Sequence, residues 1–93
     1  MIEITNNSGA HRYEAVLDGQ LAGYCSYTQD GKVITFTHTV VKPEFEGKGV
    51  GSSLAKHVLE DSRAHGMKVV PVCEFIKAYI SRHAEYQNLV VHS

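Results

Sequence analysis

Three glycines, Gly47, Gly49 and Gly51, alternate with other residues directly after a run of β-forming residues. A stretch with helical periodicity begins at once, so the segment predicts a strand, a glycine loop and a helix in that order. At such a junction, backbone N–H groups and the positive end of the helix dipole point at one spot. Glycine lets an anion approach the backbone because it has no Cβ. The loop therefore predicts a binding site for a phosphate or pyrophosphate group.

Two familiar phosphate-binding loops do not match this segment. The P-loop of nucleotide hydrolases ends in Gly-Lys-Ser/Thr, whereas Gly47-Lys48 is followed here by Gly49, and Gly51-Ser52 has no lysine. The dinucleotide fingerprint needs G-x-G-x-x-G in the first βαβ unit, and these glycines have another spacing and follow several strands. The site therefore belongs to a third kind of phosphate loop.

The residues before the loop predict antiparallel strands, which we place at 2–5, 11–17, 20–28 and 33–41. Asp18-Gly19 and a second turn of the same chemistry, Gln29-Asp30-Gly31-Lys32, predict the hairpins between them. The sheet thus grows as a meander of about four strands.

After the loop the apolar period changes to that of a helix, which Gly66 ends. Met67–Val72 predicts a short apolar strand in a central position, and Pro71 within it suggests a bulge or a splayed strand end. A second helix begins at Cys73 or Glu74 and runs to about His83. Residues 87–91 fit either a short edge strand or a packed tail.

The predicted order is β-β-β-β-α-β-α, which gives an α/β (α+β) fold with α-β-α after the meander around a mixed sheet. We expect one domain over residues 1–93. A splayed strand pair beside the glycine loop would leave a crevice for a long, thin ligand.

Composition narrows the partners. The net charge of −1 gives no reason to expect nucleic acid, and no apolar run is long enough to span a bilayer. The two cysteines predict no disulfide framework and favour a reducing, cytoplasmic setting. The histidines lack metal-ligand spacing, so we expect no metal. We expect a monomer or a weak homodimer.

The loop and its surroundings resemble the GNAT superfamily of acyl-CoA-dependent acetyltransferases. Glu46-Gly47-Lys48-Gly49-Val50-Gly51 is similar to its Arg/Gln-x-x-Gly-x-Gly/Ala loop, and Val41-Lys42-Pro43-Glu44-Phe45 is similar to its V-x-P-x-F/Y entry. The region from Thr37 and the segment Val70–Tyr86 resemble a small, minimal branch of single-domain members. Glu46 stands where Arg or Gln is usual, and Val40 stands where that branch often has Glu.

The resemblance implies a minimal GNAT fold that binds acetyl-CoA as cosubstrate and passes acetyl to an amine of an unidentified small molecule or protein. It implies that the pyrophosphate lies on the loop while the pantetheine arm follows the end of the fourth strand. The implied binding residues are Val40, Val41, Glu46, Gly47, Lys48, Gly49, Val50, Gly51 and Ser52. We expect Glu46 to point away from the pyrophosphate and Lys48 to supply positive charge. The GNAT helices that usually wall the acceptor site are missing here, which leaves that side open.

Three side chains are catalytic candidates, each with a structural alternative. Cys73, at a predicted helix start, is either a nucleophile or neighbour of the CoA sulfur, or a buried inert thiol. His38 is either a base for the amine or a structural histidine. The resemblance makes Tyr79 a candidate acid toward the leaving thiolate, although it fits the core equally well. The alternative function is a non-enzymatic module that binds acetyl-CoA or CoA without turnover.

Overall fold

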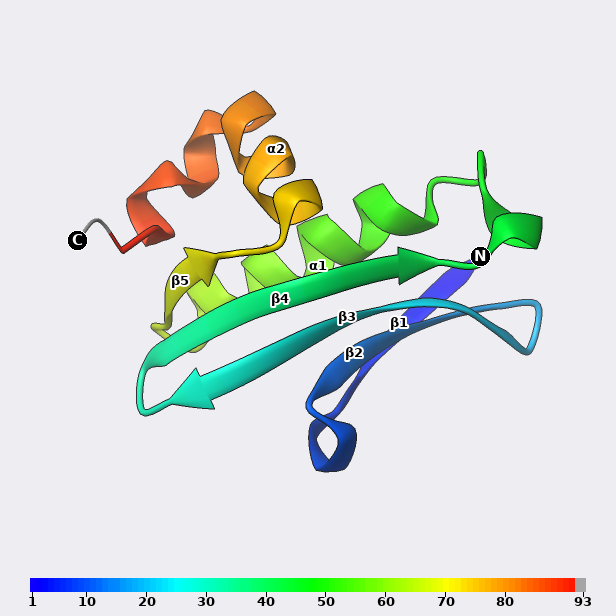
Figure 1. Ribbon diagram of the computed structural model, residues 1–93, viewed down its shortest axis with the longest axis horizontal. Coiled ribbons are helices and arrows are strands. Elements are labelled where there is room, and N and C mark those ends of the chain that lie inside the picture. The colour runs from blue at the N-terminus through cyan, green and yellow to red at the C-terminus, as the bar shows by residue number, and fades with distance from the viewer. Residues whose placement is uncertain (92–93) are drawn as a thin grey trace.

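The computed structural model describes residues 1–91 as one five-stranded sheet with two α-helices (Figure 1). The strands are Ile2–Asn7 (β1), Arg12–Leu17 (β2), Gln20–Asp30 (β3), Val33–Val41 (β4) and Lys68–Pro71 (β5). The α-helices are Val50–Ala64 (α1) and Glu74–Arg82 (α2). Short 3₁₀ turns are Ser8–Ala10 (η1), Pro43–Phe45 (η2) and Ala84–Leu89 (η3). The predicted mixed fold and element order are confirmed.

The first four strands form the predicted antiparallel meander, β1-β2-β3-β4. The β2–β3 turn has left-handed backbone at Asp18 (φ 52°) and Gly19 (φ 77°), as a type I′ hairpin requires. β3 runs two residues beyond the predicted strand end, so the next turn is confined to Gly31 and Lys32. The bounds of β4 are those that the sequence predicted.

β5 lies at the edge of the sheet, so its predicted central position was wrong. It pairs in parallel with β4, and on its other side the described chain contributes only an isolated bridge between Val69 and Val90. Val69 is nonetheless fully buried. The apolar character of β5 thus reflects burial under helices and the tail, and the tail itself is the packed η3 turn ending in one bridge.

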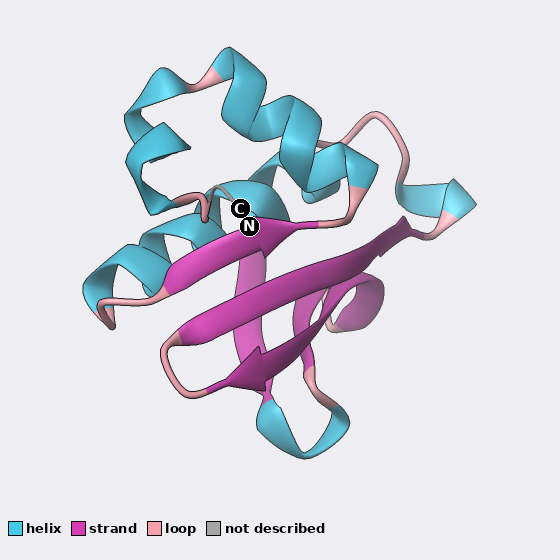
Figure 2. Ribbon diagram, turned by 60° about the vertical axis from the view of Figure 1, so that its left-hand side comes forward, coloured by secondary structure: helices cyan, strands magenta, loops and turns pink. Residues whose placement is uncertain are grey.

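Both helices lie over the same face of the sheet (Figure 2). α1 contacts all five strands, and α2 contacts β4, β5 and α1. The largest fully buried side chains, Phe36, Leu54, Leu59 and Ile76, come from β4 and the two helices. One polar pair ties the meander to α1, since the Tyr13 hydroxyl donates to Asp61 at 2.6 Å. The core is therefore a single layer between sheet and helices.

β4 and β5 stop pairing with each other near the middle of β4. Their pairing ends at Phe36 and Pro71, and a last backbone bond joins the Cys73 N–H to the Phe36 carbonyl at 2.8 Å. β4 continues to Val41, while the chain of β5 turns into α2. The splayed strand end that Pro71 suggested is confirmed. The outer edge of β4 beyond Phe36 has no strand partner among the described residues.

Gly23 is the tightest glycine position in the meander. A Cβ there would lie 2.4 Å from the Val40 carbonyl oxygen and 3.3 Å from Val50 Cγ1. We predict that Gly23→Ala lowers the free energy of unfolding by about 1–3 kcal/mol in urea denaturation, because the end of β4 must move. Gly9→Ala is the control, since its nearest neighbour would be 3.8 Å away, and it should stay within about 0.5 kcal/mol of the parent. Equal stability of the Gly23→Ala variant and the parent would contradict this packing.

Candidate acyl-donor site

Two loop glycines are required by backbone conformation. Gly47 (φ 81°) and Gly49 (φ 79°) are left-handed, and a Cβ at either would meet no atom within 4 Å. Gly49 is the N-cap of α1 and provides no side-chain cap to the helix. The first-turn N–H groups of this 15-residue helix are therefore left for a ligand. Open space in front of them leaves room for an anion.

Gly51, the third loop glycine, is required by packing and not by backbone conformation. Gly51 is not left-handed, but a Cβ there would lie 2.8 Å from Cζ of Phe75. The Phe75 ring thus rests on the first turn of α1 and holds the N-terminus of α2 against it. Phe75 is 38% exposed and lines the cleft in front of the loop. Sequence reasoning did not place it in the site, because nothing local links it to Gly51.

A cavity of about 240 Å³ opens in front of the loop. Its lining combines the three loop glycines with Val41, Phe45, Glu46, Val50, Ser52 and Phe75. Most of the predicted cosubstrate-binding residues therefore meet at one place. Glu46 is among the residues that line this cavity, and Lys48 is not.

The backbone of β4 presents Val41, not Val40, to the gap. The Lys42 N–H donates to Ala22 at 2.8 Å, and the Val40 carbonyl lies against Gly23, so both residues face β3. Backbone groups of successive strand residues point to opposite sides, which turns those of Thr39 and Val41 toward the open edge. The residues at the end of β4 whose backbone groups can bond a ligand are thus Thr39 and Val41. Because backbone directions alternate along a strand, the prediction of Val41 could have been extended to Thr39.

Cys73 lies at the inner end of the gap. It is the N-cap of α2 and is 6% exposed. Its sulfur is 3.2 Å from the Thr39 hydroxyl, which also donates to Cys25 Sγ at 3.5 Å. Burial raises the pKa of the Cys25 thiol to about 11. The structure therefore supplies a thiol at a helix N-terminus, next to a hydroxyl, where the unpaired edge of β4 begins.

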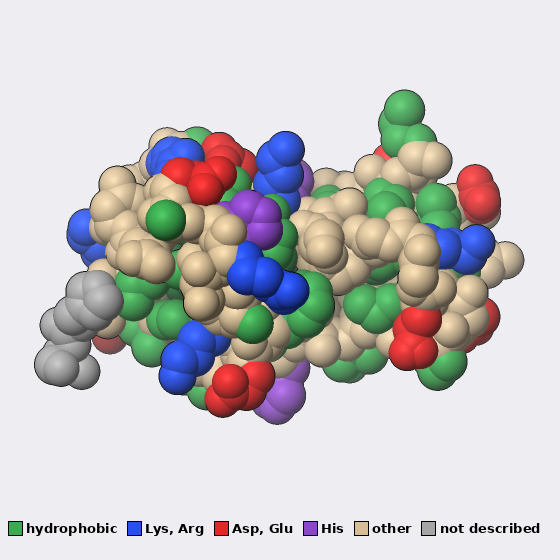
Figure 3. Space-filling view, turned by 90° about the horizontal axis from the view of Figure 1, so that it is seen from above, with side chains coloured by type: hydrophobic (Ala, Val, Ile, Leu, Met, Phe, Trp, Pro, Cys, Tyr) green, Lys and Arg blue, Asp and Glu red, His purple; other side chains and the backbone are tan. Residues whose placement is uncertain are grey.

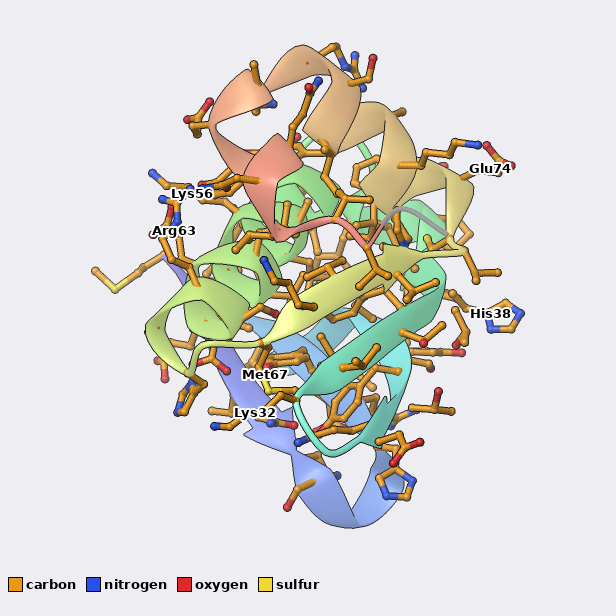
Figure 4. The ribbon with its side chains drawn as sticks, turned by 90° about the vertical axis from the view of Figure 1, so that its left-hand side faces the viewer. Lys32, His38, Lys56, Arg63, Met67 and Glu74 are labelled. Atoms are coloured by element: carbon orange, nitrogen blue, oxygen red, sulfur yellow. The ribbon has the colours of Figure 1, made fainter. Side chains whose placement is uncertain are left out.

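His38 is on the other face of the sheet from Cys73. It pairs with Ser26, whereas Thr39 pairs with Cys25 in the core. Adjacent strand residues point to opposite faces, and the His38 ring projects outward in Figure 4. The cause is a bulge, because Tyr27 pairs with Phe36 and Ser26 with His38, leaving Thr37 over. The structure thus does not join His38 and Cys73 as a pair.

Tyr79 belongs to an aromatic cluster near the C-terminal end of α2. Its ring stacks on His83 with centroids 3.9 Å apart and packs 6.1 Å from Tyr86. Burial raises the pKa of its hydroxyl. No described contact links Tyr79 to Cys73 or to the glycine loop. Tyr79 is therefore packed among aromatic rings, and its role as an acid stays a prediction.

Three further features concern surface charge, possible metal ligands and helix length. Figure 3 shows acidic and basic side chains interspersed over the helix-bearing side, without a field of one sign. Within residues 1–91, no group of three His, Cys, Asp or Glu side chains is placed to hold a metal ion. No helix in that range has the length and apolarity needed to cross a membrane.

Comparison with known proteins identifies the architecture. Residues 12–89 match the sequence model of the GCN5-related N-acetyl-transferase family. A GCN5-like protein from Staphylococcus aureus, solved by NMR, has a similar structure, with a TM-score of 0.72 and 27% sequence identity. That alignment covers 98% of this chain and 89% of the other.

Two larger proteins share the fold at lower identity. A GNAT-family acetyltransferase from Streptococcus pneumoniae aligns with a TM-score of 0.60 and 20% identity, over 88% of this chain and 55% of that one. The IAA acetyltransferase from Bacillus cereus aligns with a TM-score of 0.58 and 18% identity, over 76% of this chain and 63% of that one. The present chain thus spans only part of these two relatives.

The contact between Gly51 and Phe75 can be tested as a double-mutant cycle. We predict that Gly51→Ala destabilises the protein by about 1–3 kcal/mol, because the new methyl group overpacks against the ring. In a Phe75→Ala background the same substitution should become neutral or stabilising by up to about 1 kcal/mol, since alanine favours the helix. Urea unfolding of the four proteins measures the coupling. Additive effects would show that Gly51 and Phe75 do not touch.

Proposed function

Because this chain belongs to the GCN5-related N-acetyltransferase family, we propose that it transfers acetyl from acetyl-CoA to an amine acceptor, with Cys73 assisting at the acetyl end. The cleft in front of α1 is the observation that carries the proposal. It joins an uncapped helix N-terminus to Val41 on the unpaired edge of β4. The Cys73 thiol lies further along that edge, beside Thr39. A long ligand with a diphosphate at one end and a thioester at the other suits that shape and chemistry.

Different residues of the cleft would bind different parts of acetyl-CoA. The N–H groups at Gly49–Ser52 would hold the pyrophosphate, as helix N-termini hold anions. Val41 and Thr39 would bond the amides of the pantetheine arm through their free backbone groups, in the manner of an added strand. The apolar side chains of Val41, Phe45 and Phe75 line the cleft beside it. Glu46 opposes the diphosphate charge, so the backbone must supply most of the binding.

The acetyl carbonyl would lie near the start of the open edge, between Thr39 and Cys73. A free strand N–H there can stabilise the oxyanion that forms when a nucleophile adds to the carbonyl. In direct transfer the amine adds, its C–N bond forms, the C–S bond to CoA breaks, and the amine proton ends on the CoA thiolate. This requires no protein nucleophile and is the usual route in the family that the sequence resembles.

Transfer through Cys73 is the second route, and the position of its thiol favours it. The sulfur adds to the acetyl carbonyl, the C–S bond to CoA breaks, and the proton that Cys73 loses ends on the CoA thiolate. An amine then takes the acetyl group from Cys73 and returns a proton to that sulfur. The Cys73 thiol lies at the N-cap of α2, beside the Thr39 hydroxyl, and a thiol in such a place can serve as a nucleophile.

Binding is tested by calorimetry with acetyl-CoA. We predict saturable binding in the micromolar range and a loss of at least about a hundredfold in Gly49→Glu, because a carboxylate would enter the anion site. Gly31→Glu is the matched control, since Gly31 is also left-handed (φ 59°) and open but lies in the distal β3–β4 turn. Full affinity in Gly49→Glu, or no binding of millimolar acetyl-CoA to the parent protein, would contradict the loop assignment.

Turnover is tested in the same protein with a panel of small amines and peptide N-termini, by following release of free CoA thiol. Amine-dependent release supports the enzyme. Saturable binding without release from any amine favours the alternative of a CoA-binding module.

A further inference from the structure

A polar chain crosses the core beside the acetyl end of the cleft. It consists of the Cys25 thiol on β3, the Thr39 hydroxyl on β4 and the Cys73 thiol at the N-cap of α2. Thr39 lies 3.5 Å from Cys25 Sγ and 3.2 Å from Cys73 Sγ. The mechanism above uses the backbone of Thr39 but neither its hydroxyl nor Cys25. These side chains therefore need an explanation of their own.

The two sulfurs are not arranged to form a disulfide. Cys25 pairs with Thr39 on one side of β4, whereas Cys73 bonds through its N–H to Phe36 on the other side. Such positions are separated by two strand spacings of about 4.8 Å each. Their Cα atoms therefore lie farther apart than the roughly 7 Å that a disulfide tolerates. The hydroxyl between them is thus the link, and the cluster is a hydrogen-bond chain and not a redox pair.

The number of available protons determines which hydrogen bonds the two thiols and the Thr39 hydroxyl can form. Thr39 has one hydroxyl proton and two acceptor lone pairs. When Cys73 is a thiol, its S–H can donate to Thr39, which donates onward to Cys25. When Cys73 loses its proton, the Thr39 hydroxyl can turn and donate to the Cys73 sulfur, while the Cys25 S–H donates to Thr39. The chain can therefore reverse without moving a heavy atom.

We propose that Thr39 is the positioning residue for Cys73: its hydroxyl holds the sulfur at the gap and donates to it when it becomes the nucleophile, with Cys25 completing the chain. This rests on the proposed transfer through Cys73. His38 cannot take this part in the present arrangement because it lies on the opposite face.

Cys25 suits the far end of the chain. It is fully buried, and burial raises the pKa of its thiol to about 11, so it keeps its proton at neutral pH and remains a donor. Thr39 is half-buried between the two sulfurs. Hydrogen bonds to an ionised partner are shorter and stronger than those between neutral groups. The chain should therefore favour the reactive form of Cys73 over its resting form.

The test compares Thr39→Val, which removes the hydroxyl at nearly constant volume, with Thr39→Ser, which keeps it. Thr37→Val is the matched control, because Thr37 also lies on β4 but bonds the Ser26 carbonyl at 3.3 Å. Each protein is treated with iodoacetamide over a pH series, and alkylation of Cys73 is quantified by peptide mapping. Acetyl-Cys73 is measured separately by mass spectrometry after acid quench with acetyl-CoA. Calorimetry gives the acetyl-CoA affinity, and thermal melting checks the fold.

We expect Thr39→Val to slow both alkylation and acetylation of Cys73 by about tenfold to a hundredfold, the effect of losing a hydrogen bond to a charged group. The alkylation profile should shift to higher pH, while acetyl-CoA affinity and melting temperature stay near those of the parent. Thr39→Ser should restore most of the rate, and Thr37→Val should match the parent. Cys25→Ala should give a smaller loss in the same direction.

Alkylation of Cys73 at the parental rate in Thr39→Val would overturn the proposal. So would equal losses in Thr39→Val and Thr39→Ser, because the hydroxyl would then not be responsible. If the parent protein forms no acetyl-Cys73 while Thr39→Val still slows alkylation, the route through Cys73 fails and the positioning role stands. The two hypotheses are thereby separated.

Discussion

The parting of β4 from β5 is the constraint on which the site depends. Beyond Phe36 and Pro71 the two strands no longer pair, so β4 carries unpaired backbone groups through Val41. An unpaired strand edge inside a fold must find other hydrogen-bond partners. The same departure turns the chain into α2 and brings the N-cap residue of that helix, Cys73, to the inner end of the gap. The same departure thus produces both an unpaired strand edge and a thiol at its inner end.

The mouth of the gap is held by a contact between two helix starts. The Phe75 ring rests against Gly51, which fixes the first turn of α2 on the first turn of α1. The loop glycines therefore serve two purposes, since Gly47 and Gly49 set the backbone conformation while Gly51 makes room for the ring. Residues from the first turns of both helices, Ser52 of α1 and Phe75 of α2, consequently line the same cleft. A small domain achieves this without the helices that usually wall an acceptor site in the family it resembles.

Much of this could be predicted from the sequence, because the signals are local. The left-handed turn at Asp18-Gly19, the β-branched run of β4 and the glycine loop each carry their own geometry. The position of β5 could not be predicted, because its apolar residues are buried by helices and the tail and not by strands on both sides.

The sequence also did not reveal on which face of the sheet His38 lies. Strict alternation from Phe36 would have pointed His38 into the core, and the bulge at Thr37 gives that place to Thr39. A bulge depends on the register with β3, which periodicity within β4 does not reveal. The contact of Gly51 with Phe75 likewise joins residues that only the packing of two helices brings together. The left-handed conformation of Gly47 and Gly49 could therefore be predicted from the sequence, whereas the tertiary contacts around the loop could not. That the loop binds a ligand stays a prediction.

The central claim is that acetyl-CoA lies in the gap between β4 and β5, and amide chemical-shift mapping by NMR tests it most directly. Titration with acetyl-CoA should perturb the amides of residues 47–52, of Thr39 and Val41, and of the first turn of α2. Shifts confined to the opposite end of the sheet, around the polar cavity of Lys32, Asp61 and His65, would contradict the account, as would the absence of any shift at millimolar ligand.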